Sequence, residues 1–308
     1  MLLRGKRALP GARHSLETLQ KLGAPFVLLT NGGGVTERAK ADSLSKTLGV
    51  KIDASQVVLA HTPLKGMNEL KQSRVLVLGC HDELAVARDY GFERVVSPQE
   101  LAAQHPLYYP WDHFTPVAPT TVDAHAHEPI AAILVMHDPV DWHLELQICL
   151  DVIRRRFPPS AARAPPPLVY NTNDDIEFSS SCPHPRLAQG TFVRCLELLH
   201  GLAHVDANDA PAKLPLAVKR FGKPHGVQFT FAEAAMSSPD RLYMIGDNPA
   251  ADIRGANNAG DKWTSILVLS GMTSAPVAGG GSDEPDVVAP NVEAAVAEIL
   301  KRERAFVG

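Results

Sequence analysis

The sequence lacks the features that mark secreted, membrane-spanning and nucleic-acid-binding proteins. It has four cysteines in 308 residues and no Cys-x-x-Cys pair, so we expect free thiols in a reducing compartment rather than a disulfide framework. No apolar run approaches the roughly 20 residues that a membrane-spanning helix requires, so we expect no membrane span. The net charge of −4 argues against a basic surface, and we expect no nucleic-acid partner.

The chain is long enough for two domains and apolar enough to give each a buried core. Apolar residues make up 45% of it and charged residues 21%, which argues against general disorder. Short apolar runs alternate with helical patterns, as in an α/β protein with a parallel sheet. We expect strands at 26–30, 74–78, 94–96, 131–136, 168–170, 241–245 and 265–269, helices at 37–48, 83–90, 141–153, 192–199 and 292–303, and loops at 106–129, 158–167 and 274–290.

The clearest strand–turn–helix unit lies near the N-terminus. A continuous apolar run at 26–30 is typical of a buried parallel strand, and Asn31 with three glycines follows as a turn. Thr36 is suited to the N-cap position, and Gly49 is suited to the left-handed conformation that ends many helices. Together they predict a helix over 37–48. The glycines lack the Gly-x-Gly-x-x-Gly spacing, so they do not indicate a dinucleotide site.

The most informative segment covers residues 244–257, which read as a strand end, a tight turn and a helix start. Gly246 permits a sharp turn, after which Asp247 and Asp252 lie close enough to share one cation. Oxygen ligands of this kind suit Mg²⁺, which binds through one or two carboxylates plus substrate phosphate. The alternative is a solvated turn in which Asp252 caps the helix. Asn248 is expected either to contact the phosphate or to shape the turn.

Two other segments complete a predicted phosphate site. Thr30 and Asn31 end a strand with a hydroxyl and backbone N–H groups that can hold phosphoryl oxygens. Lys223, between Gly222 and Pro224, offers an ammonium group. Positive charge, positioning and a cation on the phosphate oxygens are what phosphoryl transfer needs. The alternatives are a simple turn at 30–31 and a surface lysine at 223.

In order and spacing, these segments resemble the motifs of the haloacid dehalogenase (HAD) superfamily of phosphatases. Thr30 matches the second motif, Lys223 the third, and Gly246-Asp247 with Asp252 the fourth. The similarity is closest to the subgroup with a large α/β cap, and within it to the eukaryotic cat-eye-syndrome-critical-region branch. The segments that carry the branch resemblance are 28–34, 61–63 and 246–257.

The resemblance implies a fold, which we state as an expectation. It is a doubly wound parallel α/β core made of residues 1–72 and 206–308, with an inserted α/β cap at 73–205. Ligands of such sheets bind at the carboxyl ends of strands. The cap would close over the site, exclude water and select the substrate.

The resemblance also implies a chemistry, a Mg²⁺-dependent hydrolysis of small phosphate esters through an aspartyl-phosphate intermediate. Lys223 would bind the phosphoryl group and orient the nucleophile. The partner would be a small phosphorylated metabolite, and a homo-oligomer through the cap is an open expectation. The branch suggests mitochondria and glycerophospholipid metabolism, with the cytoplasm as the alternative. The implied site residues are Asp247 and Asp252 for the metal, Lys223 for catalysis, and Thr30, Asn31, Lys223 and Asn248 for substrate.

The first motif of the family, Asp-x-Asp-Gly at the end of the first strand, has no counterpart. Leu2 to Gly5 match the segment that follows it, so no nucleophile can be assigned and the chain as printed is expected to be inactive. Each buried hydrogen bond lost with a central strand costs roughly 1–3 kcal/mol, against a domain stability of about 5–15 kcal/mol. We therefore expect an incomplete gene model or transcript. The alternative is a pseudoenzyme that binds a phosphorylated metabolite or a protein partner.

Three further polar clusters are less informative. The His, Asp and Glu side chains at 123–128 lack helical spacing, so we expect a solvated loop rather than a metal site. Cys182 and His184 lack an orienting third group and do not indicate a nucleophile pair. The Asn-Asp-Asp run at 173–175 is expected to face the substrate or to form a plain turn.

Overall fold

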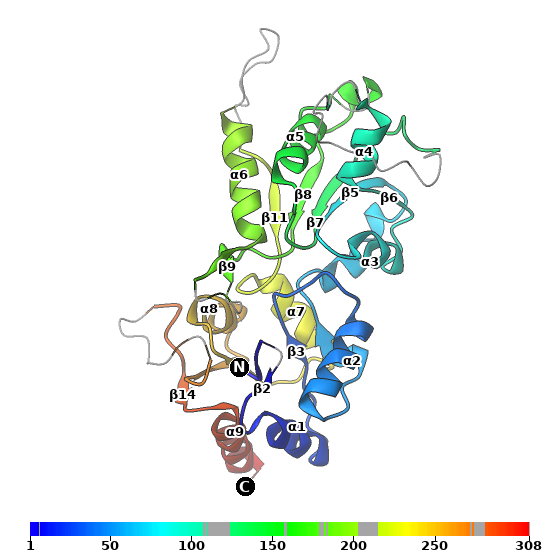
Figure 1. Cartoon of the computed structure of the whole chain (residues 1–308). Helices are drawn as coiled ribbons and strands as arrows, with labels where there is room; N and C mark the ends of the chain where they lie inside the picture. The colour runs from blue at the N-terminus through cyan, green and yellow to red at the C-terminus, as the bar shows by residue number, and fades with distance from the viewer. Residues whose placement is uncertain are drawn as a thin grey trace. The chain divides into compact units, whose positions relative to one another are not determined.

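The computed structural model is an α/β protein, as the sequence predicts, and divides into two compact units (Figure 1). Unit 1 comprises Met1–Thr30, Thr36–Leu59 and Gly222–Gly308, and unit 2 comprises Asn31–Val35 and Ala60–Phe221. Unit 2 is therefore inserted into unit 1 in the sequence. The structure describes residues 1–5, 7–106, 109, 124–156, 159–178, 182, 184–202, 215–271, 273 and 281–307.

Unit 2 is built on a five-stranded parallel sheet with the order β11-β8-β7-β5-β6. A two-stranded antiparallel pair, β9 (Glu177–Phe178) and β10 (Arg186–Leu187), forms a separate small sheet. The elements of the main sheet and its helices are β5 (Arg74–Leu78), α3 (Glu83–Asp89), β6 (Arg94–Val96), α4 (Pro98–Gln104), β7 (Ala132–Val135), α5 (Trp142–Ile153), β8 (Leu168–Asn171), α6 (Gln189–Gly201) and β11 (Val218–Arg220).

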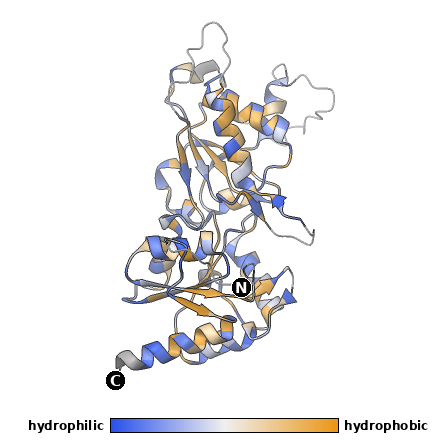
Figure 2. Ribbon diagram, turned by 90° about the vertical axis from the view of Figure 1, so that its left-hand side faces the viewer, coloured by the Kyte–Doolittle hydropathy of each residue, from blue (hydrophilic) through white to orange (hydrophobic). Residues whose placement is uncertain are grey.

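The central strands β5 and β7 of unit 2 are buried on both faces because helices cover both. Successive side chains of a strand point to opposite faces, and Leu76 and Leu78 of β5 join one cluster with residues of α4, α5 and α6. Helix α3 packs on β5 and β6 but contributes no residue to that cluster. Figure 2 shows hydrophobic residues concentrated on the strands. This explains why β5 and β7 read in the sequence as continuous apolar runs.

Unit 1 contains a three-stranded parallel sheet with the order β12-β13-β14 and, separately, the parallel pair β3 and β4. Leu242 and Met244 of β12 pack with α7 and α8 on one face, whereas Tyr243 and Ile245 lie against the cluster that includes α9 on the other. The bounds are β1 (Leu3–Arg4), β2 (Arg7–Ala8), α1 (Ala12–Lys21), β3 (Leu28–Leu29), α2 (Glu37–Leu48), β4 (Val57–Val58), α7 (Gly226–Ala235), β12 (Leu242–Gly246), α8 (Arg254–Ala259), β13 (Trp263–Val268), β14 (Val287–Ala289) and α9 (Val292–Val307).

Local signals set the ends of α2 as the sequence predicts. The Thr36 hydroxyl accepts a hydrogen bond from Ala39 N at 3.2 Å, and Gly49 is left-handed with φ 67°. These contacts satisfy groups that the first and last turns of a helix leave without intrahelical partners. The predicted helix over 37–48 is therefore confirmed residue for residue.

The bounds of the two units differ from the expected core and cap segments. Residues 60–72 lie in unit 2, and so does β11, which was expected in the second core segment. The reason is that Val218–Arg220 pairs in parallel with β8 and completes an edge of the five-stranded sheet. Residues 206–214, at the start of the expected second core segment, lie outside the described residues, as do 203–205 at the end of the expected cap.

The expected loop over 274–290 is wrong at its end, because β14 (Val287–Ala289) extends the unit 1 sheet by pairing with β13. Helices α1, α4 and α7 were not predicted, since their short apolar patterns are weak without their packing partners. Among the described residues, no helix combines the length and the hydropathy needed to cross a membrane.

One buried carboxylate makes the stability of unit 2 depend on pH. The Glu145 side chain on α5 is 1% exposed, and its Oε2 atom has no hydrogen-bond partner. Burial, together with the negative charges of Asp141 and Glu83, raises the pKa of Glu145 from 4.5 to about 7. The folded protein therefore keeps this proton to higher pH than the unfolded chain does.

We predict that Glu145 contributes stability below about pH 4.5 that is lost as the pH rises through about 7. The loss amounts to roughly 3 kcal/mol of unfolding free energy, from about 1.36 kcal/mol per pKa unit. A Glu145→Gln variant should lack this part of the pH dependence and exceed the wild type in stability at pH 8. Urea unfolding across this pH range, with the exposed Glu177→Gln as control, measures the effect. Equal pH slopes for Glu145→Gln and the wild type would contradict the prediction.

Candidate active site

The turn after β12 is organised by the carboxylate of Asp252. Its Oδ2 atom accepts hydrogen bonds from Asp247 N at 3.1 Å and from Asn248 N at 3.0 Å. A Cβ atom on Gly246 would lie 2.1 Å from the Asp252 Cβ, so only glycine fits there. The chain then passes through a wide helical turn, Pro249–Ile253, into α8. The Asp252 carboxylate therefore stabilises the backbone of the turn and does not cap α8.

Lys223 completes this arrangement from a distant part of the sequence. Its ammonium group donates hydrogen bonds to Asp252 Oδ1 at 2.6 Å and to the Leu29 carbonyl at 3.2 Å. The side chains of Lys223 and Asp252 are 12% and 5% exposed. The alternative of a surface lysine is thus wrong. The contacts place the ammonium at the carboxyl ends of β3 and β12, where parallel sheets bind ligands.

Asp247 is the more accessible of the two carboxylates, with 19% of its side chain exposed. Its Oδ2 atom lies 3.1 Å from the Met1 nitrogen. A Cβ atom on Gly271 would come within 1.8 Å of the same oxygen, which fixes the carboxylate against a glycine backbone. An accessible carboxylate oxygen fits the donor chemistry of Mg²⁺.

The remaining predicted site residues are divided between the two units. Thr30 follows β3 in unit 1, and its backbone N–H donates to the Val58 carbonyl at 3.0 Å. Asn31 belongs to unit 2, where its side chain donates to Asp175 Oδ2 at 3.2 Å. The Asn248 Oδ1 atom accepts from Ala250 N at 3.0 Å, as expected of a residue that shapes the turn. Unit 1 thus brings together Lys223, Asp247, Asn248 and Asp252, with Thr30 next to the Leu29 carbonyl.

The Asn-Asp-Asp run at 173–175 takes part in a charge network of unit 2. Asp174 forms ion pairs with Arg220 and, at 3.2 Å, with Arg194. Asp175 N donates to the Asn173 side chain at 2.9 Å, which is typical of a turn stabilised by asparagine. These contacts hold the loop after β8 in place.

The cluster at 123–128 is internally paired where it is described, because His125 Nδ1 lies 2.7 Å from Glu128 Oε1 and Glu128 pairs with Arg94. Asp123 lies outside the described residues.

The sequence reasoning missed a different cluster. Within the described part of the chain, the one group of three or more side chains placed to hold a metal ion is Cys80, His81 and His137. Cys80 and His81 come shortly after the predicted strand at 74–78, and His137 directly follows the predicted strand at 131–136. This shared position after a strand was the sequence signal that could have identified the cluster.

The chain is an α/β protein in which predicted site residues follow the carboxyl ends of parallel strands. Residues 1–93 match a family model described as haloacid dehalogenase-like hydrolase, and residues 220–295 match one described as HAD-hydrolase-like. The chain belongs to the haloacid dehalogenase-like hydrolases. The two matched segments lie on either side of most of unit 2, as expected for an inserted domain.

Two relatives are similar over most of this chain. A cardiolipin synthase (CMP-forming) / mitochondrial hydrolase fusion protein of Schizosaccharomyces pombe is 34% identical over 292 residues, which cover 88% of this chain and 47% of that protein. A mitochondrial hydrolase of Saccharomyces cerevisiae is 29% identical over 313 residues, covering 88% and 85%. The chain therefore spans about half the length of the fusion protein and most of the yeast hydrolase.

Solved structures share the fold. A hypothetical protein of Pyrococcus horikoshii OT3 superposes with a TM-score of 0.71 at 21% identity, covering 97% of this chain and 96% of that chain. A glycerol phosphate phosphatase of Mycobacterium tuberculosis in complex with calcium superposes with a TM-score of 0.67 at 17% identity, covering 96% and 71%. The same phosphatase in complex with magnesium gives 0.66 at 18% identity, covering 96% and 73%.

We predict that Asp252 is the main electrostatic support of unit 1. An Asp252→Ala variant removes the carboxylate that lies 2.6 Å from the largely buried Lys223 ammonium and that accepts from two backbone N–H groups. The expected loss of unfolding free energy is about 3–5 kcal/mol, measured by urea unfolding. Asp247→Ala, which removes a more exposed carboxylate from the same turn, should cost only about 1 kcal/mol.

The double variant Asp252→Ala/Lys223→Met separates lost charge pairing from lost packing. Removing both charges should recover much of the stability lost in Asp252→Ala, because no buried charge is then left unpaired. A double variant as unstable as Asp252→Ala would show that the ion pair is not the cause.

Proposed function

We propose that this chain supplies the metal-binding and phosphate-binding parts of a Mg²⁺-dependent phosphatase of small phosphate esters. The observation that carries the proposal is the ion pair of Lys223 and Asp252 beside Asp247, at the carboxyl ends of β3 and β12. Positive charge next to a carboxylate that suits Mg²⁺ is the combination that phosphoryl transfer requires.

The contacts favour distinct roles for the two carboxylates. Asp252 uses one oxygen for Lys223 and the other for two backbone N–H groups, so we assign it to positioning. Asp247 is more exposed, and we assign it to the metal. Mg²⁺, when bound, would neutralise charge on the phosphoryl oxygens. Lys223, held by Asp252 and the Leu29 carbonyl, would bind a phosphoryl oxygen and orient the nucleophile.

Thr30 and Asn31 would contribute as neighbours of the phosphoryl group. The backbone N–H of Thr30 already donates to the Val58 carbonyl, so we assign the Thr30 hydroxyl to phosphate binding. Asn31, whose side chain bonds Asp175, would act through its backbone N–H. We assign Asn248 to shaping the turn that presents Asp247.

No Asp-x-Asp-Gly sequence occurs among the 308 residues, so we assign no nucleophile. Strands β3 and β12 belong to separate sheets, although Leu29 packs with Leu242 and Met244 in one apolar cluster.

In a second candidate function, the chain binds a phosphorylated metabolite without hydrolysing it. Lys223, Asp247 and Asp252 would then provide binding only. The two candidates share one site and differ in a single measurable property, which is turnover.

We predict that the printed chain shows no Mg²⁺-dependent hydrolysis of an aryl phosphate or of glycerol phosphate. A version extended by a strand ending in Asp-x-Asp-Gly should hydrolyse them. In the extended version, Asp247→Asn should lower kcat/KM by about 100-fold or more, because one metal-binding charge is lost. Asp240→Asn, an exposed aspartate just before β12, is the matched control and should leave turnover unchanged.

Turnover by the printed chain would contradict our account of the nucleophile. An extended version that binds phosphate in the presence of Mg²⁺ but does not turn over would favour the binding function. An extended version that neither binds nor hydrolyses phosphate would overturn both candidates. Calorimetric titration with inorganic phosphate distinguishes these outcomes.

The relatives support an extension of the proposal to substrate and location. Both named relatives are mitochondrial hydrolases and one is fused to a cardiolipin synthase, which favours mitochondria and phosphate esters of glycerophospholipid metabolism. A solved structure with the same fold is a glycerol phosphate phosphatase, so glycerol phosphate is the first substrate to test. A homo-oligomer through the inserted unit stays a prediction.

A further inference from the structure

The cluster of Cys80, His81 and His137 lies at the carboxyl edge of the unit 2 sheet. Strands β5 and β7 are parallel neighbours, and Leu78 at the end of one pairs with Val135 at the end of the other. Cys80 and His137 each follow their strand by two residues, so the register brings them side by side. This site lies wholly in unit 2 and shares no residue with the Asp247 site of unit 1.

The three side chains are already close to the geometry of a metal site. Cys80 Sγ lies 3.0 Å from His137 Nδ1, and one ligand atom from each of the three residues lies within 4.8 Å of the others. A tetrahedral zinc ion with bonds of about 2.0–2.3 Å separates its ligand atoms by roughly 3.4–3.6 Å. Small side-chain adjustments would therefore suffice for all three to coordinate one ion.

The glycine turn near the N-terminus holds both imidazole rings in position. A Cβ atom on Gly34 would lie 2.9 Å from Cδ2 of His81 and 2.9 Å from Cδ2 of His137, and Gly34 has a φ of +79°. Only glycine accommodates both this backbone conformation and the close approach of two rings. Neither the phosphate site nor a dinucleotide motif accounts for this glycine, whereas a fixed pair of histidines does.

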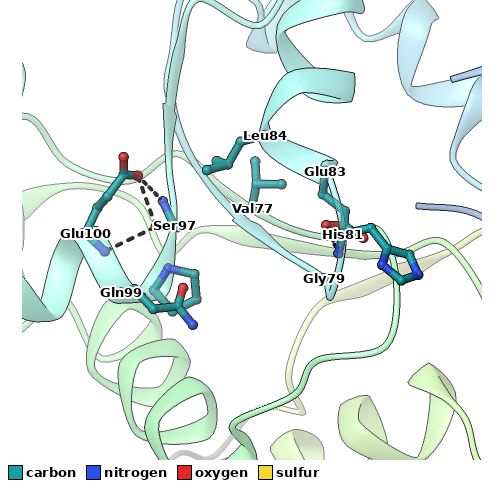
Figure 3. A pocket seen from close by; sticks show the side chains of 9 residues that line it. Val77, Gly79, His81, Glu83, Leu84, Ser97, Gln99 and Glu100 are labelled. Carbon is teal, nitrogen blue, oxygen red and sulfur yellow. Dashed lines mark hydrogen bonds between the residues drawn. The ribbon is translucent and has the colours of Figure 1, made fainter. Parts of the chain in front are cut away.

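Acidic groups surround the cluster and favour a cation there. Glu83 accepts hydrogen bonds from Cys80 N at 3.1 Å and His81 N at 2.8 Å, and Asp138 Oδ2 lies 3.6 Å from His137 Nδ1. Figure 3 shows the neighbouring cleft, in which His81 lies beside Gly79 and Glu83 on one side and Glu100 lies on the other side. His81 is exposed, so an ion can reach the cluster from solvent.

The arrangement does not suit a catalytic cysteine. In a Cys–His–Asp triad the thiol and the carboxylate bind opposite ring nitrogens, but Cys80 and Asp138 both lie nearest Nδ1 of His137.

We propose that Cys80, His81 and His137 form a binding site for Zn²⁺, with Asp138 or water in the fourth position. A thiolate and two imidazoles are ligands that zinc prefers, in contrast to the oxygen ligands of the Asp247 site. The ion would join the loops that follow β5 and β7 and would fix one end of the cleft lined by Gly79, His81 and Glu83.

The test is metal binding by the metal-free full chain. Zn²⁺ titration should give one tight site per chain, and Co²⁺ substitution should give a thiolate-to-cobalt charge-transfer band. Cys80→Ser should abolish the band and weaken Zn²⁺ binding by about 100-fold or more, since a coordinating thiolate is lost. Cys195→Ser, which changes another partly exposed cysteine of unit 2, is the matched control and should keep both.

Two further variants distinguish loss of a zinc ligand from loss of folding and from changes at the site proposed for Mg²⁺. His81→Ala changes an exposed side chain and should weaken Zn²⁺ binding without unfolding the chain, even if Cys80→Ser fails to fold. Asp247→Asn should leave the charge-transfer band unchanged, which separates this site from the one proposed for Mg²⁺. Absence of a thiolate–cobalt band in the wild type, or an equal band in Cys80→Ser, would overturn the proposal.

Discussion

The largely buried ion pair between Lys223 and Asp252 is the interaction on which the arrangement of the predicted site residues in unit 1 depends. It joins the segment after Phe221 to the turn after β12, and through the Leu29 carbonyl it also reaches the end of β3. A buried ammonium without a counter-charge would be strongly unfavourable, so the positions of these three segments are coupled. The same carboxylate anchors the backbone of Asp247 and Asn248, and so sets where the Asp247 side chain is presented.

Both units place their chemistry at the same kind of position. Side chains that follow parallel strands gather at one edge of the sheet, because all carboxyl ends point the same way. In unit 1 this edge carries Lys223, Asp247 and Asp252, which suit a hard cation and a phosphate. In unit 2 it carries Cys80, His81 and His137, which suit a softer ion. The chemistry differs because the residues differ, while the geometry has the same origin.

Much of the fold could be predicted from local patterns. The helix at Glu37–Leu48 carried a cap at each end, and the strand at Arg74–Leu78 was a continuous apolar run. The strand at Val218–Arg220 could not be assigned, because its composition is polar and only its pairing with β8 makes it a strand. The helix Gly226–Ala235 had no N-cap signal, and the structure shows no side-chain cap there either.

The sequence by itself determined the order of the motifs, the identity of Lys223, Asp247 and Asp252, and the absence of an Asp-x-Asp-Gly motif, since these are properties of residue type and spacing. Only the tertiary structure decided that Asp252 binds the lysine and the turn whereas Asp247 is more accessible, because spacing does not reveal which oxygen meets which donor. Only the parallel register of β5 and β7 brought Cys80 to His137 across 57 residues. Contacts between strand ends depend on sheet order, and sheet order is a property of the folded chain.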